Sequence, residues 1–222
     1  MGFFFGAKGG FNDESHNHND IGSCVMYYDG KPCIIDLGRE EYNAKTFSPR
    51  RYEIWTMQSG FHNLPVINGT DQKEGKNFKA RNSSFSANSK KVTFSTDIAG
   101  AYPDDAMVKS WIRTYTLVRG RSFTLSDKFE LSGLNKSITS SNIITYCKVS
   151  EVKPGLLRFE GEGFTLEMNY SHKTVKPKIE FIEVTDRALN RYWPDGVTRI
   201  SLEFINPGMK GGQAVTFTPA GK

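Results

Sequence analysis

The strongest constraint on the fold is a succession of short segments in which apolar and polar residues alternate. Three examples are Trp111–Val118, Ser122–Glu130 and Thr198–Phe204. Alternation with a period of two is typical of antiparallel strands that have one face in the core and the other in solvent. Further segments with the composition of strands are Ser23–Tyr28, Lys31–Asp36, Lys91–Ser95, Ile138–Tyr146, Leu157–Phe159, Phe164–Met168, Lys178–Val184 and Ala214–Thr218.

The segments are separated by Gly, Asn, Asp and Pro, the residues that favour turns. No window longer than about ten residues shows a helical period. The sequence therefore predicts an all-β fold, an antiparallel β-sandwich of two large stacked sheets. A length of 222 residues suits one such unit. Because no repeat, low-complexity tract or linker divides the chain, we expect one domain over residues 1–222.

Composition narrows the choice of partners. The net charge of +5 suits an anionic ligand such as an acidic polysaccharide, although a basic protein without such a ligand has the same charge. No block of Lys and Arg resembles a nucleic-acid-binding tail. No apolar run reaches the roughly 18 residues needed for a membrane span. The three cysteines lack CxxC spacing, which favours buried thiols over a disulfide framework.

Three of the four histidines fall in the first third of the chain. His16 and His18 lie in the run Ser15–Asp20, and His62 follows after Asp36. Imidazole and carboxylate groups bind metals such as zinc, and they also transfer protons near neutral pH. A His-x-His pair also occurs in loops by chance or for hydrogen bonding. The spacing alone leaves these interpretations open.

The hairpin expected at Asp29–Gly30 tests whether a shared metal is possible. With a two-residue loop, Asp36 and His18 point to opposite faces of the sheet. With a three-residue loop they share a face, but His18 lies roughly 13 Å further along the strand. A shared metal therefore requires a bulge or bend near Gly22, and glycine is a typical residue for such a break.

The order of motifs in residues 6 to about 70 resembles the heparinase II/III-like family of polysaccharide lyases, of the heparinase and oligoalginate lyase type. The residues that carry this resemblance are Gly6–Gly10, Glu14–Ser23, Asp29–Pro32, Ile35–Gly38, Arg51–Tyr52 and His62–Gly69. Beyond residue 70 the resemblance rests on the β-rich character of the chain.

The resemblance implies a protein with an N-terminal α/α toroid and a C-terminal β-sandwich, of which this chain looks like the β-domain alone. It also implies cleavage of an acidic polysaccharide that contains uronic acid, such as a glycosaminoglycan or alginate, by β-elimination. In that reaction a base removes the proton at C5 and an acid protonates the departing O4. The family implies a periplasmic, cell-surface or secreted location in a bacterium. Because the toroid carries part of the active site, we expect the isolated β-domain to have negligible activity.

The resemblance also assigns individual residues. It implies that His18, Asp36 and His62 bind one structural zinc ion per chain, and that His16 lines the active site and takes part in catalysis. Nearby cations and aromatic residues fit a polysaccharide site, because Arg binds carboxylate or sulfate groups and Tyr stacks on sugars. The candidate substrate-binding residues are Tyr42, Arg50, Arg51 and Tyr52, for which surface salt bridges or ordinary sheet packing are the alternative.

Two other functions stay open on the sequence. The first is a non-catalytic module in which a metal-braced loop binds acidic glycans without cleaving them. The second is a metal-dependent hydrolase that uses His18, Asp36 and His62 with an open coordination position. Upstream sequence and reaction products would distinguish these functions from a lyase.

Overall fold

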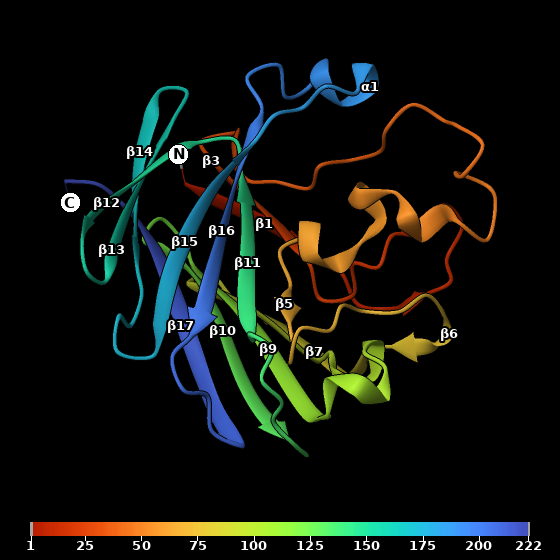
Figure 1. The fold of residues 1–222 in the computed structure, drawn as a ribbon. Coiled ribbons are helices and arrows are strands. Elements are labelled where there is room, and N and C mark those ends of the chain that lie inside the picture. The colour runs from red at the N-terminus through yellow and green to blue at the C-terminus, as the bar shows by residue number, and fades with distance from the viewer. Residues whose placement is uncertain (1, 222) are drawn as a thin grey trace.

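The computed structural model describes residues 2–221, which form two large antiparallel sheets stacked face to face (Figure 1). The predicted antiparallel sandwich is therefore confirmed. The first sheet has seven strands, with β5 paired to β11 beside the main order β1-β3-β4-β11-β16-β15. Their bounds are β1 Phe3–Ala7, β3 Cys24–Tyr28, β4 Lys31–Ile34, β5 Pro65–Val66, β11 Ser140–Thr145, β15 Val175–Ile182 and β16 Val197–Phe204.

The second sheet has eight strands in the order β12-β13-β14-β17-β10-β9-β8-β7. Their bounds are β7 Arg81–Ala87, β8 Lys91–Asp97, β9 Val108–Val118, β10 Ser122–Leu131, β12 Lys148–Lys153, β13 Leu156–Gly161, β14 Phe164–Asn169 and β17 Lys210–Pro219. Two short strands, β2 Phe11–Asn12 and β6 Gly75–Lys79, form a separate pair.

Helices are short throughout the described residues. The α-helix α1 covers Arg187–Asn190, and the 3₁₀ turns η1 to η5 cover Arg51–Glu53, Trp55–Met57, Ser59–Phe61, Ala99–Ala101 and Asp104–Ala106. None of these helices is long and apolar enough to cross a membrane.

The main core fills the space between the two sheets. Large side chains from the second sheet, such as Tyr115, Phe123 and Phe217, pack against apolar residues of the first sheet such as Met26 and Ile200. A second layer of loops covers the outer face of the first sheet around Ile144 of β11. All six residues of β11 are buried because both faces of this strand are covered. The loops that carry the predicted site residues are thus anchored on the centre of a sheet.

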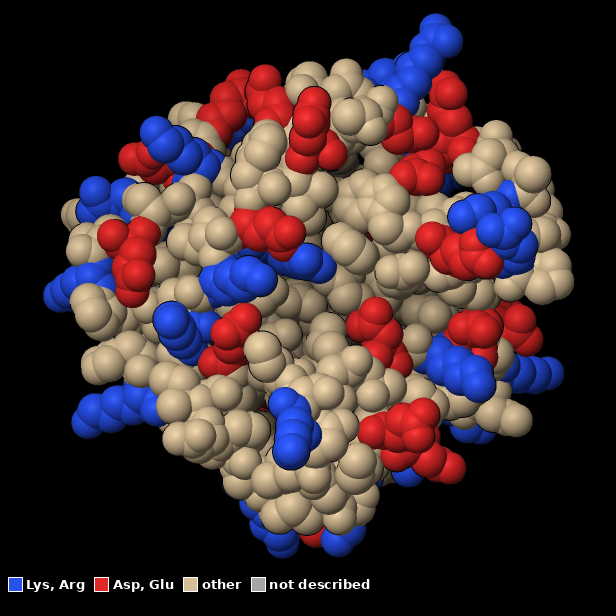
Figure 2. All heavy atoms as spheres, in the orientation of Figure 1, with Lys and Arg blue, Asp and Glu red and all other residues tan. Residues whose placement is uncertain are grey.

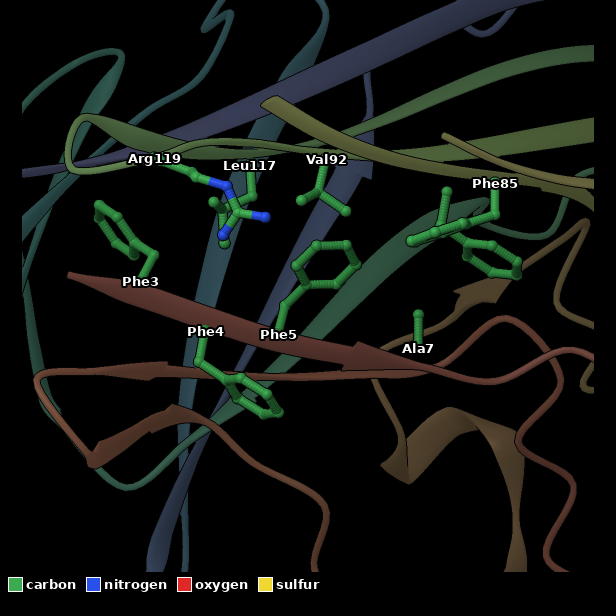
Figure 3. A pocket seen from close by; sticks show the side chains of 9 residues that line it. Phe3, Phe4, Phe5, Ala7, Phe85, Val92, Leu117 and Arg119 are labelled. Atoms are coloured by element: carbon green, nitrogen blue, oxygen red, sulfur yellow. The ribbon is translucent and has the colours of Figure 1, made fainter. Parts of the chain in front are cut away.

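An apolar groove of about 350 Å³ lies where the edge strand β1 meets strands β7 to β9 of the other sheet. Figure 3 shows Phe3 and Phe5 pointing from β1 toward Leu117 and Val92, while Phe4 points to the other side of the strand. Phe4 packs edge-on against Tyr27 of β3, with ring centroids 6.1 Å apart. This alternation is what a strand with two differently covered faces requires.

Candidate functional site

A bulge in the first hairpin places Asp36 on the side where His18 lies. The loop has two residues, Asp29 and Gly30, both with positive φ, and Tyr28 pairs with Lys31. The register then shifts by one residue, so that Met26 faces Ile34. This bulge restores the face that a two-residue loop alone would invert.

The break expected near Gly22 is also present, as a tight turn. Gly22 has a φ of +83°, and the Ser23 amide donates to the Asp20 carbonyl at 2.9 Å. A Cβ atom at Gly22 would lie 2.5 Å from the Ile98 side chain, so a larger residue does not fit. The turn redirects the chain before β3 and thereby brings His18 back over the end of β4.

His18, Asp36 and His62 form one group, which we call the metal group. Their potential ligand atoms all lie within 4.8 Å of one another. Nδ1 of His62 and Oδ2 of Asp36 are 3.0 Å apart, and the His18 and His62 ring centroids are 5.4 Å apart. His62 is fully buried, whereas His18 and Asp36 are half-buried. The structure thus places the three residues of the predicted metal site side by side, and metal binding by them stays a prediction.

The charges of the three groups are strongly coupled. Burial, and after it the positive charge of the neighbouring His62, lower the pKa of His18 to about 4. Burial raises the pKa of Asp36, but His62 and the Gly38 amide outweigh burial and hold that pKa well below its usual value. Burial lowers the pKa of His62, yet the attraction of Asp36 raises it overall. At neutral pH the group therefore holds a carboxylate and a neutral His18 imidazole, which are competent metal ligands.

The donor set fits a metal ion. Nε2 of His62 is buried and has no hydrogen-bond partner among the described residues, which is unusual for a buried polar atom. Two imidazoles and one carboxylate are a frequent ligand set for zinc, whose tetrahedral ligands lie about 3.3 to 3.6 Å apart. Asp20 lies nearby, but its carboxylate is held by Lys8 Nζ at 2.5 Å.

Asn63 fixes the strand ends that carry two of these residues. Its side-chain amide donates to the carbonyls of Cys24 at 2.7 Å and Ile35 at 2.8 Å, and its oxygen accepts from the Ile144 amide at 2.6 Å. One buried side chain thus joins β3, the residue before Asp36, and β11. Because Asn63 directly follows His62, the same contacts also position that histidine.

A buried ion pair in the sandwich core supports the group from below. Arg113 of β9 and Asp127 of β10 are fully buried and bonded at 2.7 and 2.8 Å. Nη1 of Arg113 also donates to the carbonyl of Asn63 and lies 3.5 Å from that of Gly22, which also accepts from the Tyr115 hydroxyl. The loops before β3 and after His62 are therefore tied to the opposite sheet.

The interpretation of the sequence missed this ion pair, although a signal was present. In Trp111–Leu117 the odd-numbered residues point inward, and Arg113 occupies an inward position between two aromatic residues. Asp127 occupies the equivalent position between Leu125 and Phe129. A charge on the apolar face of an alternating strand predicts a buried, partnered group.

His16 does not contribute to the metal group, although it is only two residues from His18. It is exposed, and its φ is +59°, a left-handed conformation that is uncommon for a residue with a side chain. Asn17 and Asn19, on either side of His18, are buried. Asn17 Nδ2 donates to the Tyr52 hydroxyl at 3.1 Å, and the Asn19 backbone amide donates to the Met57 carbonyl at 2.9 Å. The loop therefore turns His16 outward and His18 toward the metal group.

A hollow of about 410 Å³ lies beside His16. We call it the His16 hollow; it is lined by Asp13, Glu14, Ser15, His16, Asn17, Thr46, Phe47, Ser48, Arg51 and Tyr52. The ring of Phe47, which is 72% exposed, meets His16 edge-on at 6.3 Å. An exposed imidazole next to an aromatic surface and a tyrosine can bind a ligand and transfer a proton to or from it.

The predicted substrate-binding residues have different surroundings. Arg51 and Tyr52 line the His16 hollow, but Arg51 also donates to the carbonyls of Asn17 and Thr46 and so braces the loop. Arg50 is exposed and paired with Glu53 at 2.8 and 2.9 Å. Tyr42 is 50% exposed outside the hollow, where it packs against Phe47 at 5.1 Å.

The net positive charge is not gathered over the face drawn in Figure 2. On this view of the described residues, Lys and Arg side chains alternate with Asp and Glu. Attraction of an anionic ligand would then depend on individual arginines rather than on a broad field.

A comparison with protein families identifies the fold's relatives. A family profile described as "Heparinase II/III-like, C-terminal" matches residues 3–184. The chain belongs to this family. Since the profile covers most of the chain, the family resemblance extends well beyond the motifs of the first 70 residues. No curated protein sequence matches significantly.

Solved structures of heparinases share the fold of this family member. Heparinase III, the BT4657 gene product, superposes with a TM-score of 0.71 at 14% identity over 98% of this chain. The heparan sulfate lyase HepC from Pedobacter heparinus gives a TM-score of 0.68 at 13% identity over 97% of this chain. The chain spans about a third of the length of each, 33% and 32% respectively. At this identity the likeness concerns the fold.

Proposed function

We propose that this chain is the β-domain of a polysaccharide lyase that cleaves an acidic, uronic-acid-containing polysaccharide by β-elimination, in a periplasmic or extracellular setting in a bacterium. The observation that carries the proposal is that the two histidines of the loop 15–20 face different surroundings. His16 is exposed on a hollow with aromatic and cationic neighbours, while His18 is turned into the metal group. Family membership and the named activities of the solved relatives support the same reaction class.

In this proposal the metal group has a structural task. Zinc held by His18, Asp36 and His62 would fix the loop that presents His16 and would not take part in bond cleavage. The tether from Arg113 and Tyr115 to the Gly22 carbonyl gives the same loop a second, rigid support. Accurate placement of an acid–base group matters because small displacements lower the rate of proton transfer strongly.

The chemistry assigned to His16 is proton transfer at the sugar. Elimination needs one group that takes the C5 proton and one that protonates O4, and positioned acid–base groups each contribute about 10²–10⁴-fold. His16 would serve as one of them, or would face the uronate carboxylate, together with a toroid residue. Arg51 and Tyr52 line the same hollow and would contact the sugar, with Tyr42 and Arg50 at its periphery.

The test compares histidines in the full-length protein. The His16→Ala variant should lose at least about 100-fold in the formation of unsaturated uronate from a panel of uronate polysaccharides. His172→Ala is the matched control, since this histidine lies outside the site, and it should keep full activity. Hydrolytic products without the unsaturated chromophore would favour the hydrolase, and binding without any product would favour the glycan-binding module.

A further inference from the structure

A second hollow, of about 410 Å³, has Asp36 in its lining. It is formed between the loop 36–39 and α1, and we call it the α1 hollow. Its lining consists of Asp36, Leu37, Gly38, Arg39, Ala188, Leu189, Arg191, Tyr192 and Trp193. A concave surface of this size with aromatic residues and a few charged groups is typical of small-ligand sites.

The α1 hollow is preformed by contacts between its two walls. The indole of Trp193 donates to the Leu37 carbonyl at 3.0 Å, and the Glu41 amide donates to the Asp186 carboxylate at 3.1 Å. Asp186 also caps α1 through the amides of Ala188 and Leu189. Because both walls are held together by polar contacts, a ligand would not need to order them.

The charged groups of the α1 hollow favour an anion. Asp36 is engaged by His62 at 3.0 Å and by the Gly38 amide at 2.9 Å. Arg191 is exposed and forms no ion pair among the described residues, and Arg39 lies on the same lining. Tyr192 is 72% exposed beside them. Guanidinium groups next to an aromatic ring suit a sugar that carries a carboxylate or sulfate.

A series of neighbouring side chains, whose aromatic rings pack edge to face and which we call the aromatic track, connects the two hollows. The Arg39 guanidinium lies 4.3 Å from the Tyr42 ring centroid, Tyr42 lies 5.1 Å from Phe47, and Phe47 lies 6.3 Å from His16. Tyr42 and Phe47 are both largely exposed. The α1 hollow and the His16 hollow thus lie at the two ends of one continuous aromatic surface.

We propose that the α1 hollow is a distal binding site for an anionic sugar of the same polysaccharide chain that reaches His16, with Arg191 and Tyr192 as its main contacts. The inference rests on the proposed function and adds to it a site remote from the reacting bond. A long oligosaccharide would occupy both hollows across the aromatic track, whereas a short one would occupy the His16 hollow alone.

The experiment measures binding by calorimetry in full-length protein that carries His16→Ala and therefore consumes its ligand at least about 100-fold more slowly. The probes are tetrasaccharides and dodecasaccharides of heparan sulfate and of alginate. We expect Arg191→Ala and Tyr192→Ala each to weaken binding of the preferred dodecasaccharide about tenfold or more and to leave tetrasaccharide binding unchanged. Arg187→Ala is the matched control, since it removes the same charge from α1 but does not line the hollow.

The outcomes separate the distal site from the proposed function. If the full-length His16→Ala protein binds the dodecasaccharide, and Arg191→Ala and Tyr192→Ala in this background bind it equally well, the distal site is refuted and the lyase proposal stands. An equal loss of dodecasaccharide affinity in Arg187→Ala would refute the distal site too, because the loss would then follow from the change in net charge and not from contacts in the hollow. If the parent binds no oligosaccharide at all, the proposed function fails, and the distal site fails with it. Both substituted side chains are exposed, and thermal unfolding verifies that the variants fold.

Discussion

Removal of Arg113 should destabilise the sandwich far more than removal of a surface arginine. The side chain is completely buried, and its loss would leave the Asp127 carboxylate without its cationic partner in the core. Breaking a buried pair on one side typically costs about 3–5 kcal/mol. Since domains have a total stability of about 5–15 kcal/mol, Arg113→Met would consume a large part of it.

The assay is urea unfolding at neutral pH, followed by fluorescence of the three tryptophans. Arg113→Met should lower the free energy of unfolding by about 3–5 kcal/mol. In the double variant Arg113→Met/Asp127→Leu the unpaired charge is gone, and the residual loss should come mainly from the Asn63 carbonyl, about 1–3 kcal/mol for a buried group left unpaired. The Gly22 carbonyl keeps the Tyr115 hydroxyl as its donor. The double variant should therefore be more stable than the single one.

Arg158→Met is the matched control on the same sheet. Arg158 of β13 pairs with Glu167 of β14 at 3.2 Å, but its side chain is 41% exposed, so we expect a cost of about 0–1 kcal/mol. A loss of less than about 1 kcal/mol in Arg113→Met would refute the reasoning. So would a double variant less stable than Arg113→Met, because an unpaired Asp127 would then not be the main source of the damage.

Two further predictions concern the metal group. Protein purified without chelator should contain about one zinc per chain, His62→Ala should abolish it, and His172→Ala should retain it; elemental analysis that finds folded wild-type protein without zinc would contradict the assignment. In metal-free protein, His18 stays neutral in the folded state down to a pH of about 4, whereas the unfolded chain protonates near 6.5, so the unfolded state binds more protons between these values. The free energy of unfolding should therefore fall as the pH is lowered, by about 2 kcal/mol between pH about 7 and about 5, relative to the same change in His18→Gln. An equal change in the free energy of unfolding between the two pH values in both proteins would contradict a buried neutral His18.

Much of the fold follows from strand alternation, which is a local property. The long strands β9, β10 and β16 were predicted within three residues because each has one face in the core. Strand β7 was missed, since all seven of its residues are exposed and it has no apolar face to produce a period. Strand β11 was predicted from its apolar content, but its burial on both faces depends on a loop layer from distant residues.

The candidate site was predictable in composition more than in geometry. The residue types and order indicated that His18, Asp36 and His62 could meet, and the need for a break at Gly22 followed from strand spacing alone. The shift of register opposite Met26 was not foreseen, because a bulge has no strong sequence signal. The α1 hollow was missed because its walls lie about 150 residues apart in sequence and meet only in the folded chain.

The hairpin that leads to Asp36 has a consequence for how this chain tolerates changes of length. The two-residue loop and the bulge together decide which face of the sheet the carboxylate occupies. Deleting or inserting a single residue between Gly22 and Asp36 would turn that carboxylate away from His62, however conservative the remaining sequence. The stretch 40–50 forms no strand, so an added residue there should leave the metal group intact. Length variation should therefore be tolerated on one side of Asp36 and excluded on the other.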